Sequence, residues 1–422
     1  MDETTTMCSD CAQNRHLKNL IARDGVPLYC SICRQRQSKV FDLEQLADTL
    51  SAAIQGNFVP VGRDGDAPGD SLGTIVEGML TQEVPYLNVL IETIIVRYDC
   101  GTRDHEEGFL DAGGAYRTVQ HRVSAERLEK RWRELECELK HKRRFFSESV
   151  KAFFDDLFAE LVAYSTWDVN ELGIDPVVRT LASGMHVFRA RAIESERAGV
   201  TASAPLSEVG PPPRDKARSM RMSPEGVVAL YAAMESQTAI AELRPAIGGT
   251  VAVVELALTK PLHVLDFERL ERVLDAGWSE LLHPRPQVAR ETWLFLRKLH
   301  RLIASPVMPG HEDDYLMTQS MAEYLARVHP LKLDGILFKS VQHQDGTNLV
   351  VFPDRDAPDG EDRFPIDYVR GSLSFHRVNR VAYAVEKLAL EHDGDGDLWL
   401  HSEAQLQERE EAWRDGGSEE DA

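Results

Sequence analysis

The sequence predicts a mixed α+β protein, in which a small cysteine element and an all-helical domain precede a larger domain of strands and helices. Two Cys-x2-Cys pairs open the chain, helix-period apolar patterns follow, and β-rich apolar runs recur in the second half. Apolar positions at i, i+3 and i+4 are typical of helices, whereas short runs rich in Val and Ile are typical of buried strands. The predicted units are a zinc ribbon or knuckle at 1–38, a helical domain at 39–165, an α+β domain at 166–400 and a disordered acidic tail at 401–422.

Length and composition are those of a multidomain globular protein. Of the 422 residues, 43% are hydrophobic and 28% charged, and no apolar run approaches the roughly 20 residues that cross a bilayer. The acidic N-terminus, MDETTTMCSD, is unlike a secretory signal, so a cytoplasmic location without membrane contact is expected. The formal net charge of −21 argues against nucleic-acid binding, which needs a positive surface.

The first four cysteines have the spacing of a metal site. Cys8 and Cys11 form one pair and Cys30 and Cys33 the other, with 18 residues between the pairs. This spacing favours a structural zinc ion held by four thiolates, which leaves no open position for catalysis. The alternative is a pair of reduced knuckles without metal. The isolated Cys100 and Cys137 are predicted to be small buried hydrophobes.

The helical prediction rests on apolar stripes. Residues 41–50 repeat apolar positions at helical spacing, 85–97 carry a dense apolar face, and 125–142 are highly charged around one stripe of Leu and Trp. A loop rich in Gly, Pro and Asp is expected at 56–72, and the charge runs are interpreted as solvated helix faces. A further helix is expected to continue to Tyr164.

Strands and loops alternate in the second half. Strands are expected at 186–192, 250–258, 263–267, 334–340 and 349–352, the last two as a hairpin, and further strands around 371–390. Helices are expected over 268–304 and from residue 315, where Ser320 and Glu323 match a capping box. A loop is expected at 199–213. The next segment, 214–221, has four cations against one acid, which suits either a phosphate-bearing ligand or a solvated loop.

Residues 221–245 concentrate polar side chains on an apolar background. A turn at 223–226 leads into an apolar run that ends at Tyr231, and a short helix carries Glu242 before Pro245 stops it. Arg221 opens the stretch. A rigid element that presents Arg, Tyr and Glu together is typical of a site. The alternative is a surface hairpin and helix with ordinary solvated charges.

Several motifs of the second half together resemble the RES domain, a family named for its Arg, Glu and Ser. The motifs are FRAR (188–191), RMSPEG (221–226), ALYAA (229–233), QTAIAELRP (237–245), YLMTQSMAEYL (315–325), and DGILFKS (334–340) followed by NLVVF (348–352). Their order also matches the family. Three residues depart from its pattern: Met220 stands where Gly is usual, Ser223 where Asn is usual, and Phe338 where Tyr is common. The first two bear on how the turn closes on a ligand. A four-cysteine element and helices before such a domain resemble the variant with a HEPN-like N-terminal part.

The resemblance implies an ADP-ribosyltransferase-like fold and a toxin that consumes NAD. Family members cleave the nicotinamide–ribose bond by phosphorolysis or hydrolysis, and many are restrained by an antitoxin protein. NAD is thus the implied substrate, inorganic phosphate a second one, and an antitoxin or sensor protein the implied partner. Sequence does not indicate the oligomeric state. The implied catalytic residues are Glu242, Arg189, Tyr231 and Ser340, and the implied NAD-binding residues are Arg189, Arg221, Tyr231, Ser340 and Asn348.

The residue chemistry fits these roles. A fixed carboxylate such as Glu242 stabilises the positive charge that develops on the ribose. Arg189 and Arg221 suit the two phosphates, Tyr231 suits the nicotinamide end, and Ser340 suits the carboxamide or the ribose. Transfer of ADP-ribose to a macromolecule and a non-enzymatic module are the alternatives. A HEPN-type RNase is a weaker one, because no Arg-x4–6-His pair occurs within 41–165.

Overall fold

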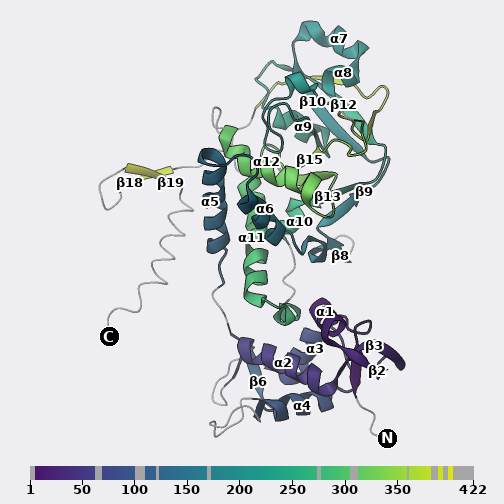
Figure 1. Cartoon of the computed structure of the whole chain (residues 1–422). Helices are drawn as coiled ribbons and strands as arrows, with labels where there is room; N and C mark the ends of the chain where they lie inside the picture. Colours follow the sequence, from purple (N-terminus) through teal and green to yellow (C-terminus); the bar gives the residue numbers. More distant parts are fainter. Residues whose placement is uncertain are drawn as a thin grey trace.

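The computed structural model describes residues 5–61, 69–99, 110–119, 123–168, 173–272, 277–304, 312–358, 361–381, 388–392 and 398–402. The helices and small sheets within residues 5–118 form one end of the molecule, and the large C-terminal sheet forms the other (Figure 1). The long helix α11 (Pro286–Ala304) runs between the two ends. This arrangement confirms the predicted α+β class. Among the described residues, no helix combines the length and apolarity that crossing a bilayer requires.

The cysteine element is a three-stranded antiparallel sheet with one helix. Strands β1 (Thr6–Cys8), β2 (Val26–Cys30) and β3 (Gln35–Asp42) lie in the order β1-β3-β2. Helix α1 (Arg15–Asp24) begins after Asn14, whose side chain accepts the backbone N–H groups of His16 and Leu17. The backbone of Gly25 passes so close to its surroundings that a Cβ would lie 2.4 Å from the Ile21 carbonyl oxygen. Glycine is therefore needed where α1 turns into β2.

The cysteine element shares its core with the helices that follow it. These are α2 (Leu43–Asn57), α3 (Leu72–Leu80) and α4 (Leu87–Asp99), and the small sheet of β4 (Phe58–Pro60), β5 (Asp70–Ser71) and β6 (Ala115–Thr118) lies beside them. Met7, Leu17 and Ile21 pack into one cluster with the buried faces of α2 and α3. The cysteine element is too small to form a hydrophobic core of its own, and α2 and α3 supply the apolar residues that complete one.

The next two helices belong to a different core. Helices α5 (Glu126–His141) and α6 (Glu148–Leu157) pack with α11 and α12 (Leu316–Glu323), where Trp132, Phe154 and Phe295 share one cluster. The helices expected within one helical domain are thus divided between two cores. Cys137 on α5 is exposed, so the prediction that it is buried is wrong: the apolar stripe of α5 lies on another face. Cys100 lies outside the described residues.

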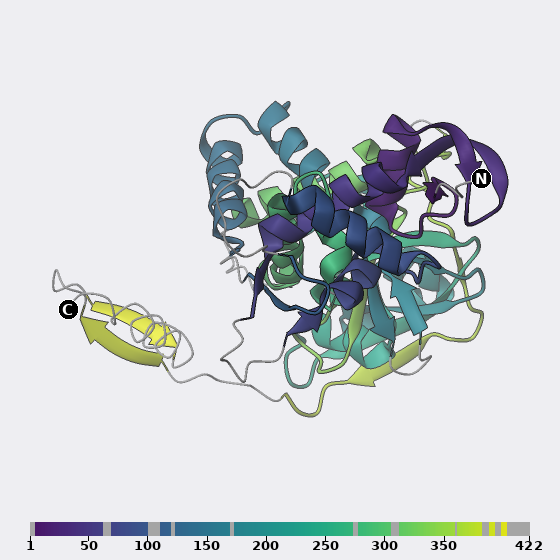
Figure 2. The same cartoon turned by 90° about the horizontal axis from the view of Figure 1, so that it is seen from below.

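The C-terminal sheet has nine strands, ordered β16-β12-β10-β11-β15-β14-β13-β9, with β17 also on β12. All neighbours are antiparallel except β13 and β14. A small two-stranded sheet of β7 and β8 precedes it, and the hairpin of β18 and β19 stands apart from the body (Figure 2). The strand bounds are β7 (Ser165–Asp168), β8 (Gly173–Pro176), β9 (Val178–Leu181), β10 (His186–Ile193), β11 (Leu230–Ala233), β12 (Thr250–Leu258), β13 (Leu262–Asp266), β14 (Gly335–Lys339), β15 (Thr347–Val351), β16 (Ile366–Tyr368), β17 (Ser374–Arg377), β18 (Leu388–His392) and β19 (Leu398–Ser402).

Two local predictions for the second half are wrong. The expected loop at 199–213 contains two short helices, α7 (Ala198–Ser203) and α8 (Pro205–Val209). The expected capping box is absent, because α12 already begins at Leu316 and Ser320 lies inside it. The remaining helices are α9 (Ser236–Glu242) and α10 (Phe267–Glu271). A short helix such as α8 gains stability from packing against β10 and β12, and α7 packs against α8; sequence propensity does not register such contacts.

Candidate functional site

A cavity of about 580 Å³ lies where the large sheet opens between β10 and β11. The two strands pair at a single position, Phe188 with Ala233, whereas β10 pairs with β12 along its whole length. Pro212, residues 216–221, the end of α9 and Tyr315 form the walls. The charged lining residues are five cations and one carboxylate: Arg189, Lys216, Arg218, Arg221, Arg244 and Glu242. In a chain of net charge −21 this is a local basic site.

Glu242 is clamped at the edge of the cavity. It is the last residue of α9, and its Oε1 accepts hydrogen bonds from Ser340 Oγ at 2.6 Å and from Asn348 Nδ2 at 2.7 Å. Ser340 and Asn348 are 5% and 7% exposed. Among the described residues Glu242 Oε2 has no partner, and the residue is exposed on the cavity side. The carboxylate is therefore fixed by one oxygen while the other stays available.

The turn that carries Ser340 is held by a chain of hydrogen bonds that the sequence did not reveal. Ser340 Oγ accepts the backbone N–H groups of Gln342 and His343, each at 3.1 Å, so its own hydrogen is directed to Glu242. Thr238 Oγ1 donates to Glu235 Oε2 at 2.6 Å, and its lone pair faces His343 Nδ1 at 2.9 Å. Because the threonine has one hydrogen and the carboxylate only accepts, His343 must donate from Nδ1.

Glycine is required at the end of this turn. A Cβ on Gly346 would lie 2.3 Å from Thr238 Oγ1 and 2.8 Å from His343 Nδ1. Such distances are far below van der Waals contact, so the backbone can approach these two side chains only without a side chain of its own. An isolated Gly between two strands was the one sequence signal that could have pointed to this close approach.

Arg221 lies within a tight turn that Tyr231 holds in place. Met220 and Ser223 form an isolated antiparallel bridge, and the Tyr231 hydroxyl accepts Met222 N–H at 3.0 Å and lies 3.0 Å from Ser223 Oγ. Gln319 Nε2 adds a 2.8 Å bond to the Met220 carbonyl oxygen. Ser223, which departs from the family pattern, thus takes part in closing the turn. Met220 takes part through its backbone alone.

The Arg221 guanidinium has no hydrogen-bond acceptor or ion-pair partner among the described residues. It lies over the ring of Tyr315, with Cζ 5.6 Å from the ring centroid. Burial lowers the pKa of Arg221, and the nearby Tyr315 and Glu242 oppose this shift. Burying part of an arginine without an ion-pair partner costs folding free energy unless a bound anion neutralises its charge. Arg221 is thus available to an anionic ligand.

Arg189 is largely engaged by the protein itself. Its Nε donates to the carbonyl oxygens of Val209, at 2.7 Å, and Gly210, at 3.1 Å, while Nη1 donates to the Tyr231 carbonyl oxygen. It thereby bridges β11 and the end of α8 where the sheet has opened. Burial and the neighbouring Arg191 lower the pKa of Arg189 to about 10, so it remains a cation at neutral pH. Within the described chain, Nη2 is the nitrogen left for a ligand.

Tyr231 lines the cavity, but its hydroxyl is occupied by the Met222–Ser223 turn. Burial raises the pKa of Tyr231 to about 12, so the hydroxyl is protonated at neutral pH. The structure therefore brings together all six residues predicted for the site. Arg221, Tyr231, Arg189, Glu242 and Asn348 line the cavity, and Ser340 reaches it through Glu242. Tyr315 and Arg244 also line it and were missed as site residues, although both lie in motifs that resemble the family, 315–325 and 237–245.

The four N-terminal cysteines converge as their spacing predicts. Each offers a sulfur, and the four atoms all lie within 4.8 Å of one another. Burial alone would raise the pKa of the Cys30 thiol, but backbone N–H donors of Cys33, Cys8 and Ile32 bring it down to about 7. A set of four thiols with a partly ionised member is suited to a tetrahedral metal ion. The strands that carry it lie at the other end of the molecule from the cavity (Figure 1).

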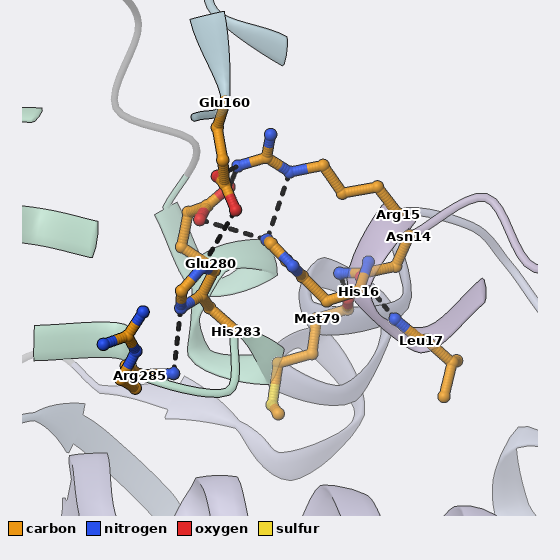
Figure 3. A network of polar contacts seen from close by, with 9 residues as sticks. All are labelled: Asn14, Arg15, His16, Leu17, Met79, Glu160, Glu280, His283 and Arg285. Atoms are coloured by element: carbon orange, nitrogen blue, oxygen red, sulfur yellow. Dashed lines mark hydrogen bonds and ion pairs between the residues drawn. The ribbon is translucent and has the colours of Figure 1, made fainter. Parts of the chain in front are cut away.

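A polar network joins α1 to the segment before α11 (Figure 3). Arg15 Nη2 lies 2.9 Å from Glu160 Oε2 and 2.7 Å from Glu280 Oε1, while His16 and His283 contact Glu280 and Glu160. The atoms of His16, Glu160 and His283 are close enough for a metal ion. Arg15, however, already neutralises the carboxylates of Glu160 and Glu280, as a metal ion would. The arrangement is that of a structural ion-pair network.

Comparison with known proteins gives one match. The family model of the RES domain matches residues 186–376, a range that holds every residue of the cavity site named above. The search of curated proteins found no match, and neither did the search of solved structures. The motifs, the clamped Glu242 and the family match agree, and this chain carries a RES domain from residue 186 to residue 376.

Proposed function

We propose that this protein is a toxin-type enzyme that cleaves the nicotinamide–ribose bond of NAD and so depletes it. RES domains are associated with NAD-related toxin activity. The observation that carries the proposal is the Glu242 carboxylate, held through Oε1 by Ser340 and Asn348 beside the unpartnered Arg221. A fixed carboxylate next to a free arginine suits a substrate with a positively charged reacting sugar and attached phosphates.

Glu242 would act on the developing charge of the ribose. As the bond between nicotinamide and the ribose carbon breaks, its electron pair goes to the nicotinamide nitrogen, which leaves neutral. Positive charge collects on the ribose, as in glycoside hydrolysis, and Glu242 Oε2 stabilises it or holds a ribose hydroxyl. Ser340 serves by fixing the carboxylate, because its hydrogen already points to Glu242. No general acid is needed for such a leaving group.

The phosphates would lie against the arginines. Arg221 offers its whole guanidinium and Arg189 its remaining Nη2, and a planar guanidinium matches phosphate geometry. Tyr231 and Tyr315 supply aromatic surface in the same cavity. The oxygen that replaces nicotinamide comes from water or from inorganic phosphate, and the proton of that nucleophile leaves to solvent. An ADP-ribosyltransferase would use the same pocket with a macromolecular acceptor.

Product analysis tests the proposal. The full-length protein is incubated with NAD, with and without phosphate, and nicotinamide, ADP-ribose and ADP-ribose 1-phosphate are quantified. We expect nicotinamide release that Glu242→Gln lowers by about a hundredfold or more. The matched control is Glu196→Gln, an exposed glutamate away from the cavity. Absence of nicotinamide release by the unmodified protein would refute the proposal, and label on a macromolecule would favour transfer.

The N-terminal third would have a structural and regulatory part. The four cysteines suit a zinc ion that stabilises the small sheet. We infer that α5, α6 and the cysteine element dock or sense a partner protein, such as an antitoxin, and restrain the RES domain until needed. Ion pairs such as Arg15 with Glu280 connect α1 to the segment that leads into α11. Binding of a partner at the cysteine element could act on the RES domain through this connection.

A further inference from the structure

We propose that the cavity also holds a third phosphate, and that the preferred substrate is therefore NADP rather than NAD. This inference rests on the proposed cleavage of a nicotinamide dinucleotide. It concerns residues 216–218, which line the cavity and were not assigned to the reacting end of the substrate.

The first observation is a surplus of cations. NAD carries two phosphates, and Arg221 with Arg189 suffices for them. Lys216 and Arg218 line the same cavity, are exposed, and have no ion-pair partner among the described residues. Arg214, two residues earlier, is instead neutralised by Asp362 through bonds of 2.6 and 3.0 Å. Only part of this basic segment is thus balanced by the protein.

The second observation is position. Lys216 and Pro212 line both this cavity and a neighbouring one of about 1200 Å³, so they mark the junction of the two. The reacting ribose belongs at the other end, because Glu242 and Arg221 line this cavity and are not among the residues that line the neighbouring one. A dinucleotide bound with its nicotinamide ribose at Glu242 extends its adenosine half toward the junction. The 2′-phosphate of NADP would lie on that half.

The acids that line the neighbouring cavity do not neutralise most of the positive charge of Lys216 and Arg218. Glu208 is bound to Arg197 at 2.8 Å, and Asp362 to Arg214. Glu194, exposed directly after the end of β10, is the remaining lining acid. Phosphate at Lys216 and Arg218 would thus meet two free cations. Inorganic phosphate bound there would be at the wrong end to attack the ribose carbon beside Glu242, which favours the 2′-phosphate.

The test compares NAD and NADP in phosphate-free buffer with the full-length protein. We expect kcat/KM for nicotinamide release to be about tenfold higher for NADP, since charge-assisted bonds to one added phosphate give roughly this factor. Lys216→Gln and Arg218→Gln should each lower the NADP/NAD ratio, and the double variant should bring it near unity. Arg197→Gln is the matched control: it removes a cation that lines the neighbouring cavity but is already paired with Glu208, and the ratio should stay unchanged.

Binding separates this inference from the proposed reaction. Calorimetry with Glu242→Gln protein should show NADP bound about tenfold more tightly than NAD, and Lys216→Gln in that background should abolish the difference. Tighter NADP binding without cleavage of either nucleotide by the unmodified protein would keep the third-phosphate site and refute the reaction. Cleavage of NAD with an NADP/NAD ratio at or below one would overturn the inference. So would a phosphate-dependent NAD reaction that Lys216→Gln abolishes.

Discussion

Ser340 Oγ donates a hydrogen bond of 2.6 Å to Glu242 Oε1, joining residues that lie 98 positions apart in the chain. Glu242 ends helix α9, and Ser340 follows strand β14, which pairs with β15. Asn348 on β15 donates to the same oxygen at 2.7 Å. The carboxylate at the centre of the site is therefore set by a helix end and a hairpin together.

Removing the Ser340 hydroxyl should impair catalysis more than binding. Ser340→Ala leaves Glu242 with one donor and leaves two backbone N–H groups without their acceptor. We expect kcat to fall about tenfold to a hundredfold with KM little changed, and the free energy of unfolding to fall by about 1–3 kcal/mol. Steady-state nicotinamide release and urea denaturation measure the two effects. Ser207→Ala, at an exposed position on α8, is the control, and an unchanged kcat in Ser340→Ala would contradict the assigned role.

The buried Thr238 should matter through its hydroxyl. Thr238→Val keeps the shape but leaves His343 Nδ1–H without an acceptor and removes a donor to Glu235. We expect a loss of about 1–3 kcal/mol in unfolding free energy together with a lower kcat, because the Ser340 turn is no longer fixed. Thr238→Ser loses one buried methyl group, at a cost of about 1 kcal/mol, but keeps the bonds and should retain kcat. Equal kcat values for the two variants would show that the hydroxyl does not position the turn.

Arg221 should contribute to substrate binding and not to stability. Within the described chain its guanidinium lies over the Tyr315 ring but has no hydrogen-bond or ion-pair partner, and burial lowers its pKa. Arg221→Gln should raise KM about tenfold to a hundredfold, while the unfolding free energy stays the same or rises, because a partly buried cation without an ion-pair partner is removed. Arg221→Lys keeps the positive charge but not the planar guanidinium, and its KM should lie between those of the unmodified protein and Arg221→Gln. Marked destabilisation of Arg221→Gln would instead indicate a structural role.

The cysteine cluster should bind one zinc ion per chain. Cys30→Ser removes the buried thiol whose pKa lies near 7, and we expect it to lose the bound metal and to lower the melting temperature of the N-terminal third. Metal analysis of purified protein and calorimetry check this. Cys137→Ser, at an exposed cysteine outside the cluster, should leave the metal content unchanged. An unaltered zinc content in Cys30→Ser would refute the site.

Helix α5 shows that an apolar sequence pattern predicts a buried helix face but not the helices that cover it. The apolar stripe of 125–142 is predicted correctly, and Leu128, Trp132, Leu135 and Leu139 are all buried in α5. Which partner buries them is not readable from the stripe, and α5 packs with α11 and α12 instead of with α2 and α3. Periodicity describes one helix surface at a time, whereas the choice of partner depends on shape complementarity between surfaces distant in sequence.

By itself, the sequence determined the α+β class, the cysteine cluster and a set of residues that meet at one cavity, because spacing, periodicity and motif order are local properties of the chain. The tertiary structure decided what each residue does. It committed two nitrogens of Arg189 to backbone carbonyls, left Arg221 unpartnered and built the Glu235–Thr238–His343 chain beneath Ser340. Hydrogen-bond partners are set by which strands lie side by side and by burial, and both arise only when segments far apart in the sequence meet.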